Sequence, residues 1–156
     1  MEQYLTEQEL QLLNPQIVQN MIQKEIPISV TVSHLTQEMK HYLKKILSTF
    51  LYQMKQECMI EYIDYCLSEL IDNSQKANAK RIYFQEQNLD IFNEQDYAQG
   101  METFKMDFIS NQERYQSCQE EKGLSMTMTL FVKDESFFLE VANNSKLTVF
   151  EYKRIH

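Results

Sequence analysis

The sequence predicts an α/β domain of the α+β type, in which helices pack on one face of a mixed β-sheet. Residues 26–33 alternate between apolar and polar side chains, which is the period of a half-buried strand. Residues 36–56 and 58–79 carry apolar side chains at steps of three and four, typical of two helices that each bury one stripe. Residues 125–142 hold two further strand-like runs around a short acidic turn, which indicates a β-hairpin.

The first 25 residues predict a small helical arm ahead of the main domain. Residues 6–13 indicate a short helix. Asn14 and Pro15 then have the form of an N-cap followed by proline at the first helical position, so a second helix is expected to run to about Lys24. We therefore divide the chain into an arm at residues 1–25 and a domain at residues 26–156.

A fourth strand is expected at residues 81–86, because Ile82, Tyr83 and Phe84 are types that favour β-structure. The polar and acidic residues 87–123 are expected to form an insertion, with an amphipathic helix over residues 96–118. Together with residues 26–33, 125–133 and 136–142, the expected strand would complete a mixed sheet.

A last helix is expected to start near Thr148 and to be unfinished at His156. We expect the chain to be a fragment of a longer protein.

The composition excludes several classes of protein. Gly100 and Gly123 are the only glycines, so phosphate loops built from clustered glycines are excluded. A net charge of −8 with scattered basic residues argues against nucleic-acid binding. No apolar run approaches the ~20 residues of a membrane span, and the N-terminus lacks the features of a signal peptide. We expect a cytoplasmic protein without a membrane span.

The cysteines and histidines show no metal-type pairing. Three cysteines are an odd number, and they are expected to be buried thiols in a reducing compartment. The three histidines are dispersed, and none has a second ligand at helical spacing. The sequence therefore predicts no metal cage of cysteine and histidine.

One helical face carries groups that can act on a nucleotide. Successive helical residues rotate by about 100°, so Glu69, Asn73 and Lys76 fall in a narrow arc opposite the stripe that includes Leu67 and Ile71. A magnesium triphosphate site needs oxygen ligands for the cation, a base for water and a positive charge for phosphate. A carboxylate, an amide oxygen and an ammonium group can supply these functions.

The string ELIDNSQKANAKRI at residues 69–82 resembles the N-box of the GHKL ATPase superfamily. That superfamily includes sensor histidine kinases, type II topoisomerases and mismatch-repair ATPases, and its box has the pattern ELxxN(S/A)xxA followed by a turn and a strand. The resemblance implies a two-layer sandwich of the histidine kinase-like (Bergerat) type, with ATP and magnesium as cofactors. It implies that Asn73 ligates magnesium, that Glu69 activates the attacking water or acceptor, and that Lys76 reaches the phosphates.

The family's second element is an Asp-x-Gly-x-Gly turn whose aspartate binds the adenine amino group. The matching position follows the predicted hairpin, where Asn143 stands in place of the aspartate, and Ser145 and Leu147 replace the glycines. An amide oxygen still accepts a hydrogen bond from adenine, but without the charge-assisted strength of a carboxylate. The family's lid, which ends in a glycine-rich segment, has no counterpart before His156, so either the lid and the C-terminal part lie beyond this chain or the site is degenerate.

The resemblance implies an ATP-binding domain of a histidine kinase-like signalling protein, with ATP-dependent phosphotransfer ahead of plain hydrolysis. Neither His34 nor His41 is followed by an acidic residue, so a phosphoacceptor histidine is expected elsewhere.

Two other functions remain open. One is a degenerate, non-catalytic GHKL-like interaction or dimerisation module that uses the N-terminal arm or the insertion at residues 87–123. The other is an all-helical adaptor, which requires that the segments after Lys80 are not strands.

Overall fold

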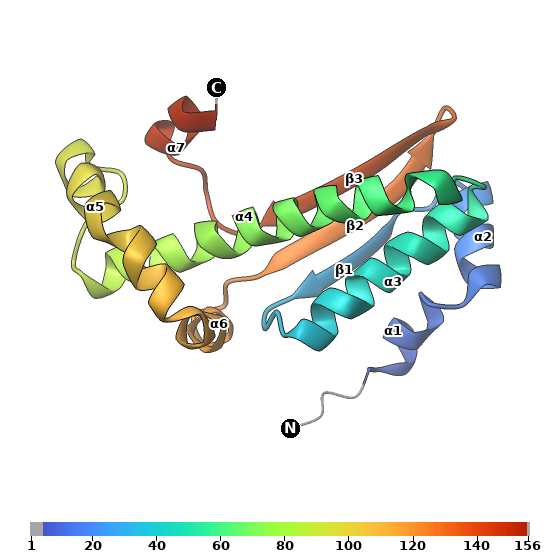
Figure 1. Cartoon of the computed structure of the whole chain (residues 1–156), viewed down its shortest axis with the longest axis horizontal. Helices are drawn as coiled ribbons and strands as arrows, with labels where there is room; N and C mark the ends of the chain where they lie inside the picture. The colour runs from blue at the N-terminus through green and yellow to red at the C-terminus, as the bar shows by residue number, and fades with distance from the viewer. Residues whose placement is uncertain (1–4, 156) are drawn as a thin grey trace.

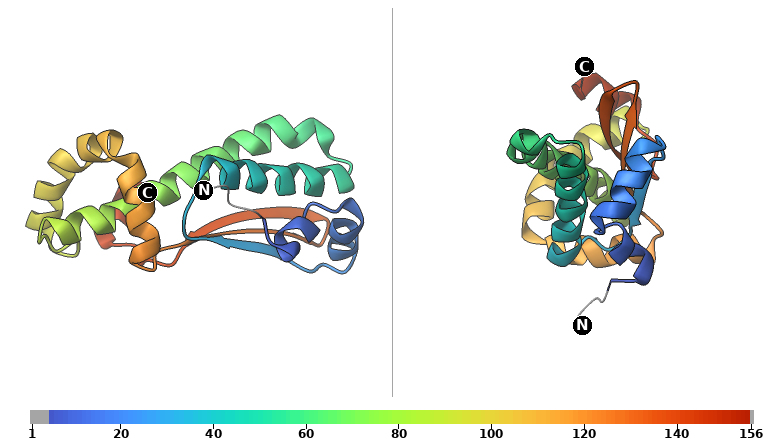
Figure 2. Two further views of the ribbon diagram at one scale, coloured as in Figure 1. Left: turned by 90° about the horizontal axis from the view of Figure 1, so that it is seen from below. Right: turned by 90° about the vertical axis from the view of Figure 1, so that its right-hand side faces the viewer.

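The computed structural model describes the backbone of residues 5–155, and the part that contains the strands consists of two layers (Figure 1). One layer is a three-stranded antiparallel sheet of β1 (Ile28–Val32), β2 (Met126–Lys133) and β3 (Ser136–Asn143), in the order β1-β2-β3. The other layer is formed by α3 (Gln37–Gln53) and α4 (Ile60–Glu86), which lie on the same face of the sheet (Figure 2). The chain is thus a mixed α and β fold, as predicted, but the sheet is antiparallel throughout and not mixed.

The strands bury one face of the sheet and leave the other to solvent. Val30 pairs with Met128, and both side chains are buried under the helices. On the opposite face, hydroxyl groups bridge β1 and β2, with 3.0 Å between Ser29 and Thr129. Asp134 and Glu135 both have positive φ, which matches the twist that a two-residue hairpin turn requires. The hairpin and the alternation at residues 26–33 are therefore confirmed.

The apolar stripe predicted for residues 36–56 forms the centre of the main core. The side chain of Thr36 caps α3 by accepting a hydrogen bond from the backbone N–H of Met39. A core residue of this size that leaves water contributes roughly 1.5–3 kcal/mol, so the stripe provides much of the driving force for packing helices on the sheet. The fully buried residues of the stripe are Leu43, Ile46, Leu47 and Phe50.

The predicted N-terminal helices are present as α1 (Glu7–Gln11) and α2 (Pro15–Gln23). Asn14 caps α2 through its side chain, with proline at the first helical position, as the sequence indicates. Val18 of α2 is fully buried in the main core, and α2 packs on α3. The hydroxyl of Tyr42 on α3 donates a 2.7 Å hydrogen bond to the carbonyl of Glu9, which fixes α1 to the same helix.

The strand predicted at residues 81–86 is wrong, because these residues are the last turns of α4, a helix of 27 residues. Ile82, Tyr83 and Phe84 are buried as consecutive helical residues because further helices surround this end of α4. Residues 57–86 contain neither glycine nor proline, so no local signal ends the helix earlier. A short 3-10 turn, η1 (Glu57–Met59), precedes α4.

The insertion forms two helices, α5 (Glu94–Ser110) and α6 (Gln112–Glu121), and not the single helix expected over residues 96–118. The break is at Asn111, whose φ of −133° is not helical and whose side chain donates to the carbonyl of Asp107 at 3.0 Å. These helices and the end of α4 enclose a second apolar cluster. Its buried residues are Ala79, Ile82, Tyr83, Phe84, Tyr97, Phe104 and Tyr115.

The last helix, α7 (Val149–Ile155), begins close to the predicted position. The cysteine prediction was wrong in part, because Cys58 is exposed while Cys66 and Cys118 are half-buried, and none of the three forms a disulfide. Within residues 5–155, no helix has both the length and the apolar character that crossing a membrane requires.

Candidate functional site

Helix α4 carries polar residues on two different faces in its middle turns. Ser74 and Asn78 are buried on the side that faces the strands. Glu69, Asn73 and Lys76 are exposed, on the side away from the buried Leu67 and Ile71, as the helical periodicity predicts.

The segment after β3 packs directly against the buried polar face of α4. The hydroxyl of Ser74 donates to Oδ1 of Asn143, and Nδ2 of Asn143 lies 3.5 Å from the carbonyl oxygen of Ser74. One turn further along, Ser145 donates to Oδ1 of Asn78 at 3.3 Å. The structure therefore brings α4 together with the segment at residues 143–145, to which the resemblance assigns adenine binding. The amide of Asn143 is already engaged by Ser74, on the opposite side of α4 from Lys76.

A groove of about 820 Å³ lies along the exposed side of α4. Asn73 and Lys76 line it, whereas Glu69 and Asn143 do not. Its opposite wall is α5, and the segment around α7 contributes Leu147 and Glu151. The groove thus contains two of the four predicted site residues.

The groove carries excess positive charge in a chain whose net charge is −8. Lysines from three elements reach it, and its two carboxylates already have partners. Asp72 lies 4.0 Å from Lys40, and Glu151 lies 3.1 Å from Lys80. Among the described residues, Lys76 and Lys105 have no carboxylate within 4.0 Å. The groove lysines are Lys40, Lys76, Lys80 and Lys105.

The wall provided by α5 is apolar and aromatic. Met101, Phe104 and Phe108 recur at steps of three and four, so they lie on one side of this helix. Tyr97 stands at the start of the wall, with its ring centroid 5.2 Å from that of Phe150. A groove with one apolar wall and several ammonium groups suits a ligand that combines an apolar ring with anionic groups.

Glu151 links α7 to the C-terminal part of α4. Its carboxylate accepts from Arg81 at 2.5 and 2.7 Å and caps α7 by accepting from the backbone N–H of Thr148. Burial alone raises the pKa of Glu151, but the bonds from Arg81 and Thr148 and the charges of Lys80 and Arg81 outweigh it. The pKa of Glu151 is therefore lowered to about 2, and the carboxylate is charged at neutral pH.

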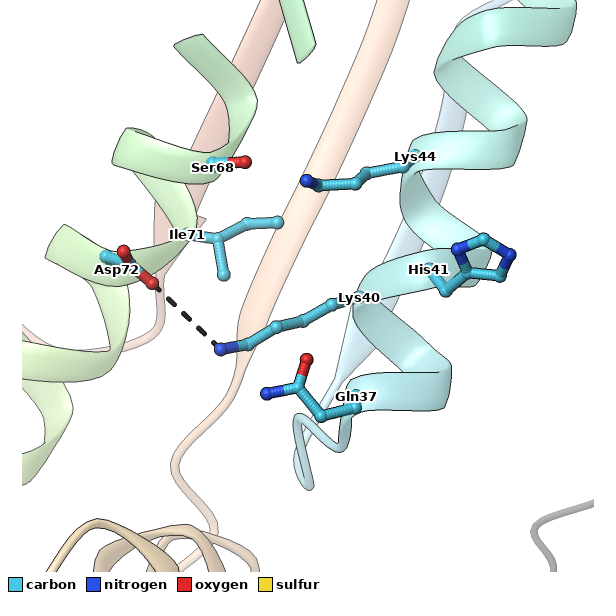
Figure 3. Close-up of a pocket in the computed structure, with 7 residues that line it drawn as sticks. All are labelled: Gln37, Lys40, His41, Lys44, Ser68, Ile71 and Asp72. Carbon is cyan, nitrogen blue, oxygen red and sulfur yellow. Dashed lines mark ion pairs between the residues drawn. The ribbon is translucent and has the colours of Figure 1, made fainter. Parts of the chain in front are cut away.

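A smaller groove of about 340 Å³ separates α3 from α4 (Figure 3). Lys40 extends from α3 toward Asp72 of α4, while His41 points away from α4. Lys44 also reaches toward α4, where it pairs with Asp64 at 3.2 Å. Lys40 and Asp72 line both grooves, so the small groove opens beside the Asn73 end of the large one.

Two side-chain oxygens of the large groove are of the type that could ligate a magnesium ion held mainly by phosphate. Within the described part of the chain, no group of three or more histidine, cysteine, aspartate or glutamate residues is placed to hold a metal. Magnesium in nucleotide sites uses one or two protein oxygens together with substrate phosphates and water. Asn73 offers an amide oxygen, and the neighbouring Asp72 offers a carboxylate in the same groove.

Sequence reasoning missed Lys80 and the groove residues that belong to the insertion. Lys80 follows Lys76 by one helical turn, so extending the helix beyond residue 79 would have placed it on the same face. No local pattern places Tyr97 or Lys105 opposite α4, because that contact depends on how the insertion folds back.

Comparison with known proteins identifies a similar protein. An uncharacterized protein of Treponema pallidum (strain Nichols) is 38% identical to this chain over 138 residues. The match covers 88% of this chain and 27% of that protein, so the chain spans about a quarter of the relative's length. No family model matches the chain, and no solved structure matches it.

Proposed function

We propose that this chain is a nucleotide-binding module of a histidine kinase-like signalling protein, and that the groove between α4 and α5 holds ATP with magnesium. The carrying observation is that Asn73 and Lys76, the N-box-like pair, line a groove that also holds three other lysines and an apolar wall. This combination is supported by position and chemistry together. If this face of α4 were only an ordinary solvent-exposed face, α5 would not have to lie opposite it and close a groove.

The lysines are placed to bind the phosphates. Two unit charges 4 Å apart attract each other by roughly 4 kcal/mol at the effective dielectric constant of a protein surface, before the loss of solvation. A phosphate that binds Lys76 or Lys105 does not have to displace a carboxylate, because neither lysine is paired among the described residues. We assign these two ammonium groups to the phosphates, with Lys40 beside them at the Asn73 end.

The proposed module binds nucleotide without turning it over. Glu69 is the carboxylate that the N-box resemblance assigns to activation of water or acceptor, yet it is exposed and lines neither groove. A general base must reach within hydrogen-bond distance of the proton that it removes. Glu69 lacks this placement, which favours binding over hydrolysis or phosphotransfer.

Calorimetric titration with ATP in the presence of magnesium tests the proposal. The unmodified protein is expected to release heat that saturates, and Lys76→Ala is expected to weaken binding about tenfold, which corresponds to about 1.4 kcal/mol. Asn73→Ala is expected to weaken binding only when magnesium is present. Lys45→Ala is the matched control, because Lys45 is exposed on α3 and lines neither groove. Absence of magnesium-dependent heat with the unmodified protein would contradict the proposal.

A second candidate is an interaction or dimerisation module that uses the insertion. It is favoured by two large apolar side chains of this segment, Phe92 and Met106, which are 61% and 69% exposed. Sedimentation of the unmodified protein over a range of concentrations tests self-association. If the insertion forms a dimer, the double variant Phe92→Ser with Met106→Ser should be monomeric. Under this alternative, neither the unmodified protein nor the double variant should bind nucleotide.

A further inference from the structure

Strand β3 is an open edge of the sheet. Among the described residues it pairs with β2 alone, and Figure 1 shows it along the outer border of the sheet. Its eight residues pair with β2 in an unbroken register without a bulge. They include no proline and no lysine, residues that commonly protect an edge against pairing with another chain. Strand β3 therefore has the form of an edge that can accept another strand.

The register of the hairpin determines which backbone groups of β3 point outward. Asp134 and Glu135 form a two-residue turn, so Lys133 and Ser136 are a hydrogen-bonded pair. Hydrogen-bonded and non-hydrogen-bonded pairs alternate along an antiparallel ladder, so every second residue of β3 directs its backbone groups away from β2. Within residues 5–155, none of these outward N–H groups donates to a backbone acceptor. They belong to Phe137, Leu139 and Val141.

The side chains of the same three residues form a half-buried apolar row on the face of the sheet that the helices cover. Each packs against the main core and is only partly buried. The ring centroid of Phe137, for example, lies 5.5 Å from that of Phe50 on α3. The row stays partly open because no strand follows β3 in the described sheet. A second apolar row beside it would remove further apolar surface from water, which favours association.

We infer that β3 pairs with β3 of a second copy of this chain, antiparallel and around a two-fold axis, so that the two sheets join into one continuous sheet. Such an interface is formed by the same surface of both copies. One register places Leu139 opposite Leu139 of the second copy and Phe137 opposite Val141 of the second copy. All outward backbone groups then meet outward backbone groups, as an antiparallel ladder requires.

The charge of the strand selects this register. Glu140 is the only charged residue of β3. In the proposed register it lies opposite Phe138 of the second copy, on the solvent side of the sheet. A shift by two residues in one direction places Glu140 opposite Glu140 of the second copy, where like charges repel. The opposite shift leaves Val141 facing the turn residue Glu135 and loses a pair. This self-complementarity favours a second copy over an extended segment of another protein.

The first test follows the unmodified chain over a range of concentrations by sedimentation and by amide hydrogen exchange with nuclear magnetic resonance. Sedimentation should show monomers in equilibrium with dimers. As dimers form, exchange at the N–H groups of Phe137, Leu139 and Val141 should slow by about tenfold. The outward N–H groups of the opposite edge, at Ser29 and Thr31 of β1, are the control and should exchange as before. Monomers at every concentration, or protection at β1 instead of β3, would overturn the inference.

The second test compares Leu139→Pro with Leu139→Ala. Both variants lose the leucine side chain, but only proline also removes the N–H group. The ladder between β2 and β3 does not use this N–H, and proline is tolerated in an edge strand at such a position. Leu139→Pro should raise the dissociation constant of the dimer about tenfold above that of Leu139→Ala. Equal dissociation constants would overturn the inference. If Leu139→Pro does not fold, the exchange pattern of the unmodified chain decides.

The double variant Phe92→Ser with Met106→Ser separates this interface from one formed by the insertion. Neither residue belongs to the sheet, so the double variant should form the dimer with an unchanged dissociation constant. A double variant that is monomeric would overturn the inference. No residue of β3 lines either groove, so the inference does not depend on the proposed nucleotide binding, and the two can fail separately.

Discussion

Ser74 of α4 and Asn143 at the end of β3 hold each other through their side chains, although 69 residues separate them. The Ser74 hydroxyl donates to the amide oxygen, and the amide nitrogen points back to the Ser74 carbonyl. This pair joins the helical layer to the end of the hairpin. It also engages the residue that, by family resemblance, would bind adenine, so any base recognised by this chain is expected in the groove on the other side of α4.

Ser74→Ala should loosen the segment that follows β3. Ser74 is 6% exposed, and losing its hydroxyl leaves Oδ1 of Asn143 without this donor. We expect a loss of about 1 kcal/mol in the free energy of unfolding. Hydrogen exchange of residues 143–147 should become faster.

Ser68→Ala is the control for Ser74→Ala. The Ser68 hydroxyl donates to the carbonyl of Asp64 in its own helix at 3.1 Å, so its removal does not touch β3. Equal exchange at residues 143–147 in both variants would contradict the linking role of Ser74.

Glu151→Gln should cost stability in a pH-dependent way. The pKa of Glu151 in the folded protein, about 2, lies below the ordinary value of 4.5, so the carboxylate stabilises the fold above pH 4.5. This contribution, of order 3 kcal/mol, is lost as pH falls from about 4.5 toward 2. Urea unfolding should show a large difference between the variant and the unmodified protein at pH 7 and a shrinking difference below pH 4.5.

Glu102→Gln provides the comparison for Glu151→Gln, because Glu102 is exposed on α5. It should change the free energy of unfolding by less than about 0.5 kcal/mol at any pH. A Glu151→Gln difference that stays constant between pH 7 and pH 3 would refute the ion-pair account of α7.

Tyr42→Phe should weaken the attachment of α1 and change the alkaline stability. Burial first, and the charge of Glu9 second, raise the pKa of Tyr42 to about 12 from 10. The neutral phenol therefore stabilises the fold below pH 10, and this contribution is lost as pH rises from 10 toward 12. We expect a loss of about 1 kcal/mol at pH 7 and faster proteolysis at residues 7–13.

The variant and the unmodified protein should converge in stability above pH 10. Unchanged proteolysis of the arm in Tyr42→Phe would show that the bond to the Glu9 carbonyl does not hold α1.

Gly100→Ala should separate α5 from α4. A Cβ atom at residue 100 would overlap the ring of Phe84, which is itself buried and cannot move into free space. Overpacking of this kind typically costs 1–3 kcal/mol. Thermal unfolding should show a melting temperature lowered by several degrees, and the groove should bind ATP more weakly.

Gly123→Ala tests a different kind of strain. Nothing lies within 4 Å of the added Cβ, and the strain arises only from a φ of +67°. It should leave ATP affinity unchanged. If Gly100→Ala also left both stability and affinity unchanged, the close contact between α5 and α4 would be refuted.

Alternation and helical stripes were sufficient to predict β1, the hairpin, α3 and the first part of α4. These signals are local, because each strand or helix shows its buried side in its own residues. The run Ile82-Tyr83-Phe84 misled the prediction because three adjacent apolar residues favour a strand when the surroundings of a helix are unknown. Their burial in a helix depends on α5, and Gly100, which permits that contact, carries no sign of its partner in the sequence.

The candidate site was predictable on α4 and not beyond it. Asn73 and Lys76 were found by spacing and by resemblance, and both line the groove. Glu69 lies on the same side of α4 but outside the groove, because the α4 residues that line the groove begin at Asp72, almost one helical turn further along. The position of α5 is a tertiary property, so Tyr97 and Lys105 could be recognised only from the structure.

The most direct test of the groove is a titration of methyl-labelled methionines with ATP and magnesium, followed by nuclear magnetic resonance. Met101 lines the groove, Met106 is 69% exposed on the same helix but lines neither groove, and Met128 of β2 is buried in the main core. The account predicts a saturable shift of the Met101 methyl signal, with Met106 and Met128 nearly unchanged. No shift at Met101 at saturating ATP, or a larger shift at Met106, would contradict it.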